Sequence, residues 1–156
     1  VARCTSRRLV EKVPIMSECN TNFMDALVVL LREHQLTRDS YLFRVNEVSE
    51  QLYFVAKGEI EFVAEEAQEV VVTDSVAVGS VVGELSFFFG MPQSSSARSK
   101  LNSPGATLYI LHREDFKELA KLYPEEEERI VKKVLATHRN EIIKGSEEST
   151  AAEGSQ

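Results

Sequence analysis

The sequence predicts an α+β fold in which an antiparallel, jelly-roll-like β-roll is flanked by N-terminal helices and two C-terminal helices. Three observations support this prediction. Apolar residues recur with helical spacing near both ends of the chain, short β-rich runs fill the stretch from Tyr41 to Leu111, and glycine or proline turns separate several of these runs. A chain of 156 residues with 43% hydrophobic content is long enough for one packed core, so we expect one domain.

Two helical segments open the chain. Residues 7–13 have helical spacing, and Pro14 ends this helix because the residue before a proline avoids helical backbone angles. Asn20 or Thr21 can cap a second helix, which we expect to run through His34. Its apolar side comprises Phe23, Met24, Leu27, Val28, Leu30 and Leu31. Such a wide stripe predicts burial against the rest of the domain.

Seven β-rich runs follow, and their number and shortness predict a sandwich or jelly-roll barrel. They are Tyr41–Val45, Gln51–Ala56, Glu59–Ala64, Glu69–Thr73, Val76–Val78, Ser96–Lys100 and Ala106–Leu111. Gly58, Asp74 with Ser75, and Pro104 with Gly105 have the residue types that favour turns between such strands.

Helical spacing returns over residues 114–123, and Pro124 opens a final helix that we expect to extend to Lys144, with Gly145 as its C-cap. Acidic residues in its first turn complement the helix dipole. The apolar stripe of this helix comprises Ile130, Val131, Val134, Leu135, His138 and Ile142. Residues 146–156 contain no apolar side chain larger than alanine, so we expect a disordered tail.

The composition excludes several classes of function. A net charge of −7 and a sequence pI near 5.1 argue against a nucleic-acid surface. Cys4 and Cys19 have neither zinc-site nor disulfide-framework spacing, which favours a reduced, cytosolic environment. No run approaches the roughly 20 apolar residues of a membrane span, and we expect no direct membrane insertion. The three histidines lack metal-site spacing and the serines lack a nucleophile motif, so catalytic and metal sites are not predicted.

The most informative segment runs from Val78 to Ser86 and is followed shortly by residues 91–95. A strand end, a glycine turn and one short helical turn would direct free backbone N–H groups at an anion, because the first N–H groups of a helix have no internal partner. Glu84 could then accept a hydroxyl proton from a sugar.

This segment resembles the cyclic-nucleotide-binding domain family, whose pattern here is G-x-x-x-G-E-(apolar)-(small), followed by Pro-Arg-(Ser/Thr)-Ala. The local sequence is most similar to the domains of voltage-gated-type cation channels of the hyperpolarisation-activated, cyclic-nucleotide-gated and ether-à-go-go groups. Further matching pieces are Arg7–Val10 with Val13-Pro14, Leu52–Val55 with Gly58, Leu108-Tyr109, Asp115-Phe116 and Tyr123-Pro124.

The resemblance implies a domain organisation and a set of site residues. Residues 1–13 would be the end of a preceding, C-linker-like helix, 14–144 the domain, and 145–156 a tail. The ancestral nucleotide pocket would comprise Gly83, Glu84, Leu85, Ser86, Gln93, Ser94 and Ser95. The terminal helix would close over it as a lid through Val134, Leu135 and His138, although a packing role is the simpler interpretation of the histidine.

One departure from the family pattern affects the predicted chemistry. Gln93 stands where the family has the arginine that forks onto the cyclic phosphate, and a neutral amide lacks that charge. Losing one charge-assisted contact costs about 1.5–3 kcal/mol. Arg98 lies an odd number of strand positions from Gln93, which places it on the opposite face.

Two further features of the sequence have smaller consequences. Asn46, in place of a family glycine, is a mild change because asparagine tolerates a left-handed backbone. Three phenylalanines, Phe87–Phe89, make the short helix bulky and favour a core role.

The resulting prediction is a non-catalytic cytosolic regulatory domain of a cation channel, of the potassium-channel type, on the cytoplasmic side of a membrane. Its terminal helix would be coupled to gating, and cAMP or cGMP binding would be weak or absent. Its partners would be the pore and linker regions of the parent protein, with a tetramer in the full protein and a monomer for the isolated domain. The alternative is a working cAMP or cGMP sensor, of a channel or a sodium/proton exchanger, that uses Glu84, Ser94 and backbone N–H groups.

Overall fold

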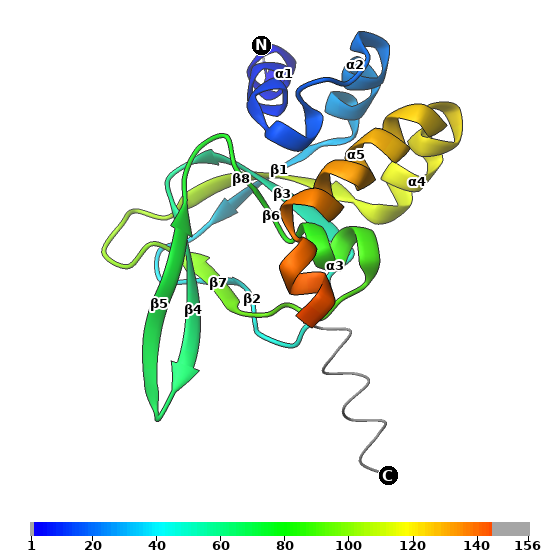
Figure 1. Ribbon diagram of the computed structural model, residues 1–156. Coiled ribbons are helices and arrows are strands. Elements are labelled where there is room, and N and C mark those ends of the chain that lie inside the picture. The colour runs from blue at the N-terminus through cyan, green and yellow to red at the C-terminus, as the bar shows by residue number, and fades with distance from the viewer. Residues whose placement is uncertain (1, 145–156) are drawn as a thin grey trace.

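The computed structural model describes residues 2–144 and confirms the predicted fold class (Figure 1). The helices lie on one side of a β-roll. The segments before the first strand and after the last strand are both helical. Ahead of the roll lie α1 (Ala2–Lys12), the 3₁₀ turn η1 (Pro14–Met16) and α2 (Thr21–Leu30). The short helix α3 (Glu84–Phe89) is inserted between strands, and α4 (Arg113–Leu122) and α5 (Pro124–Thr137) follow the last strand.

Two four-stranded antiparallel sheets form the roll. The first has the order β1-β8-β3-β6, with β1 Arg32–Leu36, β8 Ala106–His112, β3 Gln51–Lys57 and β6 Val81–Val82. The second has the order β2-β7-β4-β5, with β2 Tyr41–Phe43, β7 Ser96–Ser99, β4 Ile60–Glu66 and β5 Glu69–Val76. The helices pack against the first sheet through one core cluster, and a second cluster fills the space inside the roll.

The predicted extent of the second helix is wrong. α2 ends at Leu30, Leu31 has extended backbone angles, and β1 pairs with β8 from Arg32 opposite Ile110 to Leu36 opposite Ala106. In β1 Leu36 alone is buried, so this edge strand has no alternating apolar pattern to read. Its hydrogen bonds to a strand 70 positions away decide its conformation. The predicted cap is confirmed, because the Asn20 side chain accepts the N–H of Asn22 at 2.7 Å.

The predicted turn at Asp74 and Ser75 and the predicted strand over residues 76–78 are also wrong. β5 continues through both residues to Val76, and an irregularity opposite Phe62 and Val63 absorbs one residue of mismatch in the ladder. The chain reverses instead at Ala67 and Gln68, which have φ values of 50° and 70°. These residue types are unusual at left-handed positions, so the residue types did not indicate a turn here.

The start of α5 is tied to the start of α2. Glu126 is buried, and its carboxylate accepts the backbone N–H of Asn20 at 3.2 Å and pairs with Arg129 at 2.9 Å. Arg129 also donates to the carbonyl of Glu18. The acidic first turn of α5 therefore contributes one specific tertiary contact in addition to its interaction with the helix dipole.

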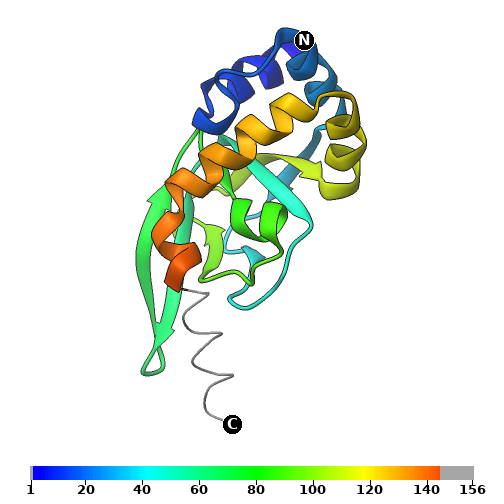
Figure 2. The ribbon, with the colours of Figure 1, turned by 45° about the vertical axis from the view of Figure 1, so that its right-hand side comes forward.

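The end of the chain differs in detail from the expected single helix. A turn at His138 interrupts the helical backbone, which resumes over residues 139–144 (Figure 2). Val134 is fully buried, whereas Leu135 is 41% exposed and so lies outside the buried side of the predicted stripe. Gly145 and the predicted tail lie outside the described residues. Over residues 2–144, no helix is both long and apolar enough to pass through a bilayer.

Candidate functional site

The predicted anion-binding segment, residues 78–86 with 91–95, is called the cassette below, and it lies at the edge strand β6 of the first sheet. Gly83 joins β6 to α3 with φ 86° and ψ 18°, and Gly90 ends α3 with φ 68°. A Cβ atom built on Gly83 would meet its neighbours at 3.5 Å or more, which is ordinary contact. The left-handed backbone, and not lack of space, is therefore what requires glycine at this position. Asn46, at the neighbouring loop, has the left-handed φ of 72° that its residue type allows.

Gln93 lies beside this turn and is 8% exposed. Its backbone is fixed on both sides, since its N–H donates to the carbonyl of Glu47 and its carbonyl accepts the N–H of Asn46, each at 2.8 Å. Its side-chain Nε2 has no hydrogen-bond partner within the described chain, and a Cβ on Gly83 would lie 3.6 Å from it. The residue therefore presents an unused, uncharged donor at the position where the family pattern has a cation.

The remaining pocket residues predicted from the sequence have different environments. Ser86 is fully buried, and its Oγ accepts the N–H of Ser49 at 2.6 Å, so its hydroxyl holds the entrance of β3 in place. Leu85 packs against the helix-side core. Ser94 is exposed and Ser95 half-buried, and neither makes a hydrogen bond through its hydroxyl to another described residue.

Glu84 at the start of α3 faces the end of α5. Its Oε2 lies 3.6 Å from Nε2 of His138, and the other ring nitrogen, Nδ1, lies 3.1 Å from Oε2 of Glu141. The His138 and Glu84 side chains are each 18% exposed. Donation from the His138 ring to the Glu84 carboxylate is the main cause that raises the pKa of His138, with further charge contributions from Glu84 and Glu141, while partial burial opposes them. The terminal helix thus contacts the carboxylate that the family pattern offers to a sugar.

Arg98 does not reach the cassette. Its Nε donates to Oε2 of Glu61 on the adjacent strand β4 at 3.2 Å, and the two side chains are 14% and 12% exposed. Glu61 also accepts the N–H of Leu101. The guanidinium is therefore held inside the second sheet by a carboxylate of that sheet.

The three phenylalanines of α3 extend the core toward α4. Phe87 is buried, and its ring and that of Phe88 each meet Phe116 edge-on with centroids 5.6 Å apart. Phe89 packs against Phe88. This cluster fixes the position of α3, and with it the orientation of the Gly83 turn.

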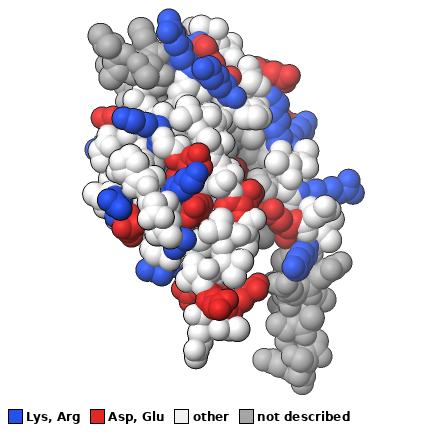
Figure 3. All heavy atoms as spheres, turned by 90° about the vertical axis from the view of Figure 1, so that its left-hand side faces the viewer, with Lys and Arg blue, Asp and Glu red and all other residues white. Residues whose placement is uncertain are grey.

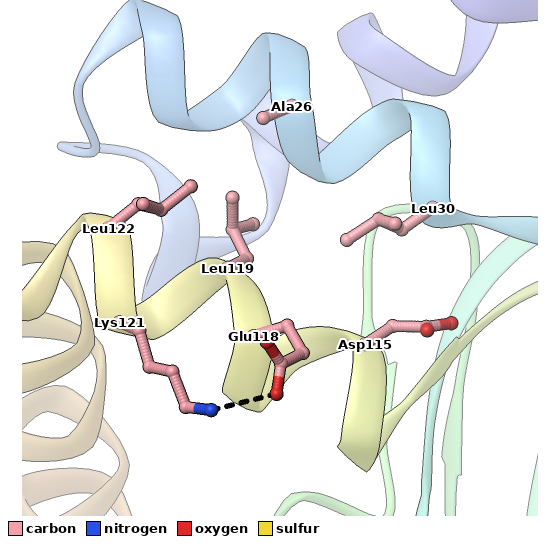
Figure 4. A pocket seen from close by; sticks show the side chains of 7 residues that line it. All are labelled: Ala26, Leu30, Asp115, Glu118, Leu119, Lys121 and Leu122. Atoms are coloured by element: carbon pink, nitrogen blue, oxygen red, sulfur yellow. Dashed lines mark hydrogen bonds and ion pairs between the residues drawn. The ribbon is translucent and has the colours of Figure 1, made fainter.

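Two open cavities lie away from the cassette. One, of about 420 Å³, lies between α2 and α4 and is lined by Ala26, Leu30, Asp115, Glu118, Leu119, Lys121 and Leu122 (Figure 4). The other, of about 370 Å³, lies along Leu135, Ala136, Arg139, Ile142 and Ile143. The first is an apolar groove with a charged rim in which Lys121 and Glu118 already pair with each other. Neither groove contains a cassette residue.

The described residues hold no group of three or more His, Cys, Asp or Glu side chains arranged to bind a metal ion. Burial and the neighbouring Glu126 carboxylate raise the pKa of the Cys19 thiol to about 12, so this thiol stays protonated and is a poor nucleophile.

Sequence reasoning selected Glu84 and His138 separately but did not pair them. The two residues are 54 positions apart, and no local pattern connects them. Sequence reasoning also did not predict that backbone groups of Asn46 and Glu47 hold Gln93. Only the folded chain brings the loop before β3, the cassette and the terminal helix together.

Comparison with known proteins assigns the chain to a family. The family model for the cyclic nucleotide-binding domain matches residues 33–123, a range that runs from β1 to the residue after α4 and includes the cassette. The chain therefore belongs to the cyclic nucleotide-binding domain family.

Similar curated proteins are channels. The chain is 25% identical over 138 residues to a cyclic nucleotide-gated channel of Caenorhabditis elegans, which covers 86% of this chain and 18% of that protein. It is 26% identical over 118 residues to the human potassium/sodium hyperpolarization-activated cyclic nucleotide-gated channel 1, covering 76% of this chain and 12% of that protein. The chain thus spans less than a fifth of the length of either relative.

Solved structures share the fold. A cyclic nucleotide-binding domain from Methylobacillus flagellatus superposes with a TM-score of 0.72 at 17% identity, covering 94% of this chain and 81% of that chain. The regulatory subunit of a cAMP-independent protein kinase A from Trypanosoma brucei gives a TM-score of 0.71 at 18% identity, covering 88% of this chain and 47% of that chain. A triple mutant of that subunit, in which one change introduces an arginine, matches equally well and is bound to cAMP.

Proposed function

We propose that this chain is the regulatory domain of a cation channel, on the cytoplasmic side of its membrane, that transmits movement of α5 to the gate without depending on a cyclic nucleotide. The similarity to channel domains supports the kind of parent protein. The buried, uncharged amide of Gln93 in the cassette is the observation that carries the loss of nucleotide dependence. Pore and linker regions of the parent, assembled as a tetramer, would be the partners of the domain.

The electrostatics of the cassette support this proposal. A cyclic phosphate carries a negative charge, and a family member neutralises it with a guanidinium that donates two parallel hydrogen bonds. Gln93 supplies an uncharged amide with two free N–H donors in place of that charged fork. Arg98 does not compensate, because Glu61 already holds its guanidinium.

The contact between the terminal helix and the cassette also supports the proposal. In a nucleotide-dependent domain, the ligand favours the docked position of the helix through its higher affinity for that state. Here Glu84 and His138 approach each other directly, at 3.6 Å, and join α3 to the end of α5. An internal contact of this kind would favour the docked state in place of a nucleotide.

Calorimetric titration of the 156-residue chain with cAMP and with cGMP tests the proposal. We expect no saturable binding in the low micromolar range. We expect Gln93→Arg to raise the affinity for cAMP by about ten- to a hundredfold, because it restores one charge-assisted contact. Gln35→Arg is the matched control, since it adds the same charge on β1, at the opposite edge of the first sheet from β6.

Low-micromolar binding by the unmodified chain would overturn the proposal. It would favour the second candidate, a cAMP or cGMP sensor of a channel or an exchanger. The observation in favour of that candidate is that the Gly83 turn is intact and that Gln93 Nε2 and the exposed Ser94 remain free to donate. If Gln93→Arg left the affinity unchanged, the missing charge would not be the reason for the loss.

A further inference from the structure

The hairpin formed by β4 and β5, residues 60–76, extends beyond the body of the roll as an arm (Figures 1 and 2). Every residue of β5 except Val76 is exposed. Val70, Val71 and Val72 are 47%, 41% and 48% exposed, although successive residues of a strand point to opposite faces. Both faces of the arm therefore present valine side chains to solvent.

The outer edge of the arm is unpaired. β5 is the last strand of the order β2-β7-β4-β5, and its ladder runs to β4 alone from Glu69 opposite Glu66 to Val76 opposite Ile60. Among residues 2–144 no other backbone group bonds to this strand. A row of free N–H and C=O groups beside exposed valines is a template for the addition of another strand.

The arm also carries a strong negative charge. Residues 60–76 contain five acidic residues and no lysine or arginine. Figure 3 faces this side of the molecule and shows acidic side chains gathered near the tip of the arm, beside an uncharged strip.

The acidic residues nearest the tip are not neutralised internally. Glu61 is paired with Arg98, and Glu65 lies 4.0 Å from Arg44. Glu66 and Glu69 make no ion pair with any described residue, and they stand directly opposite each other in the ladder. Like charges at opposed positions destabilise a hairpin, so an external cation bound between them would relieve this repulsion.

These observations discriminate between possible occupants of the edge. A second copy of the chain would bring its own acidic arm against this one, and the like charges would oppose pairing. We propose that β5 is a docking edge for a partner protein segment of extended conformation that alternates basic and apolar residues. Main-chain hydrogen bonds would hold the segment, its apolar side chains would cover the valines, and its basic side chains would meet Glu66 and Glu69.

Binding of a synthetic peptide tests the proposal. The probe is an eight-residue peptide of alternating lysine and valine, the length of β5. We expect saturable binding to the 156-residue chain, seen by fluorescence anisotropy. In NMR spectra the amides of residues 69–76 should shift and become protected from hydrogen exchange, while those of α4 should not. A peptide of the same sequence that is N-methylated at every backbone nitrogen keeps the charge but loses all backbone N–H donors, so it should bind at least about tenfold more weakly.

Charge reversal provides the matched variants. The double variant Glu66→Lys with Glu69→Lys should lose about tenfold or more in affinity for the lysine–valine peptide and should gain binding of a glutamate–valine peptide. The control reverses Glu114 and Glu118, two exposed glutamates of α4, and should bind like the unmodified chain. Equal binding by the methylated peptide, unchanged affinity after reversal at Glu66 and Glu69, or self-association through residues 69–76 in sedimentation velocity would each overturn the proposal.

Discussion

Two edges of the roll differ in how their polar groups are used. At β6 and α3, the edge is covered: the terminal helix reaches Glu84, Ser86 holds the backbone of Ser49, and the free donor of Gln93 is buried. At β5 the edge is open, and its carboxylates and valines face solvent. At the covered edge, where the family pattern predicts a ligand, Glu84 and Ser86 have internal partners and the Gln93 amide is buried. The open edge, for which no motif predicts a role, keeps its polar groups accessible.

Substitution of one buried and one exposed apolar side chain should give the largest difference in the free energy of unfolding between the two edges. Phe87→Ala removes a ring that packs on Phe116 and should lower the free energy of unfolding by about 3–5 kcal/mol. Val71→Thr on the arm should change it by less than about 0.5 kcal/mol, since that side chain is exposed. Urea denaturation followed by circular dichroism measures both. Similar losses would mean that the arm is packed in solution.

The ion pair at the base of the arm should give the next largest effect. Arg98→Met leaves the buried Glu61 carboxylate unpaired and should cost about 3 kcal/mol, while Arg98→Met combined with Glu61→Leu should recover most of this loss. The neighbouring pair of Lys100 and Glu59 is exposed, so Lys100→Met should cost less than about 1 kcal/mol. A double-mutant cycle in urea provides the values. A double variant no more stable than Arg98→Met would contradict the assignment of the cost to the unpaired charge.

The contact between His138 and Glu84 should make docking of α5 pH-dependent. The folded pKa of His138 is raised above its ordinary value of 6.5, so the contact stabilises the fold below pH 6.5 and loses this contribution as pH rises through the raised pKa. Relative to Glu84→Gln, the unmodified chain should be more stable by up to about 1 kcal/mol at pH 6, and the difference should shrink at higher pH.

NMR titration of the His138 ring checks this directly. Its pKa should lie above the ordinary histidine value of 6.5, and Glu84→Gln should lower it. Glu141 faces the same ring from the other side, so Glu141→Gln should lower the pKa by a smaller amount. An unchanged pKa in Glu84→Gln would show that α5 does not dock on α3 in solution.

The turn at the tip of the arm should give the smallest effect. Ala67 and Gln68 both have positive φ, as in the two-residue hairpin turns that favour Asn-Gly. Ala67→Asn with Gln68→Gly should therefore stabilise the arm locally by about 0.5–1 kcal/mol. Hydrogen exchange of the β5 amides should slow by about twofold to fivefold, while amides of β3 should not change. Faster exchange in β5 would contradict the turn geometry.

The sequence predicted the elements in which apolar, buried residues recur at a regular spacing. α4 and the central strands β3 and β8 have regular apolar patterns, and their predicted bounds agree with the structure to within two residues. The first three residues of β1, 32–34, were predicted as helix because the single buried residue of this strand gives no period. The hairpin turn at residues 67–68 was missed because alanine and glutamine rarely take that conformation. Pairing with the distant strand β8 determined the backbone conformation of β1, and pairing of β4 with β5 determined that of the turn.

The candidate site could be predicted in part. Glycine and glutamate at fixed spacing located the cassette, because a left-handed turn before a helix needs a specific residue type. Arg98 is held by Glu61 on the second sheet, but the predicted reason, strand parity, does not apply, because Gln93 lies before β7 begins at Ser96. The pairing of Glu84 with His138 and the burial of the Gln93 amide could not be predicted, since both depend on the packing of segments that are remote in sequence.

The fixed backbone of Gln93 has a consequence for how this domain can evolve. Because Asn46 and Glu47 hold its main chain, a longer side chain at this position would start from the same place and direction. Every glutamine codon becomes an arginine codon by one substitution at its middle base. A single point mutation in the gene would therefore place a guanidinium in the cassette, and second-messenger control would lie one mutational step away.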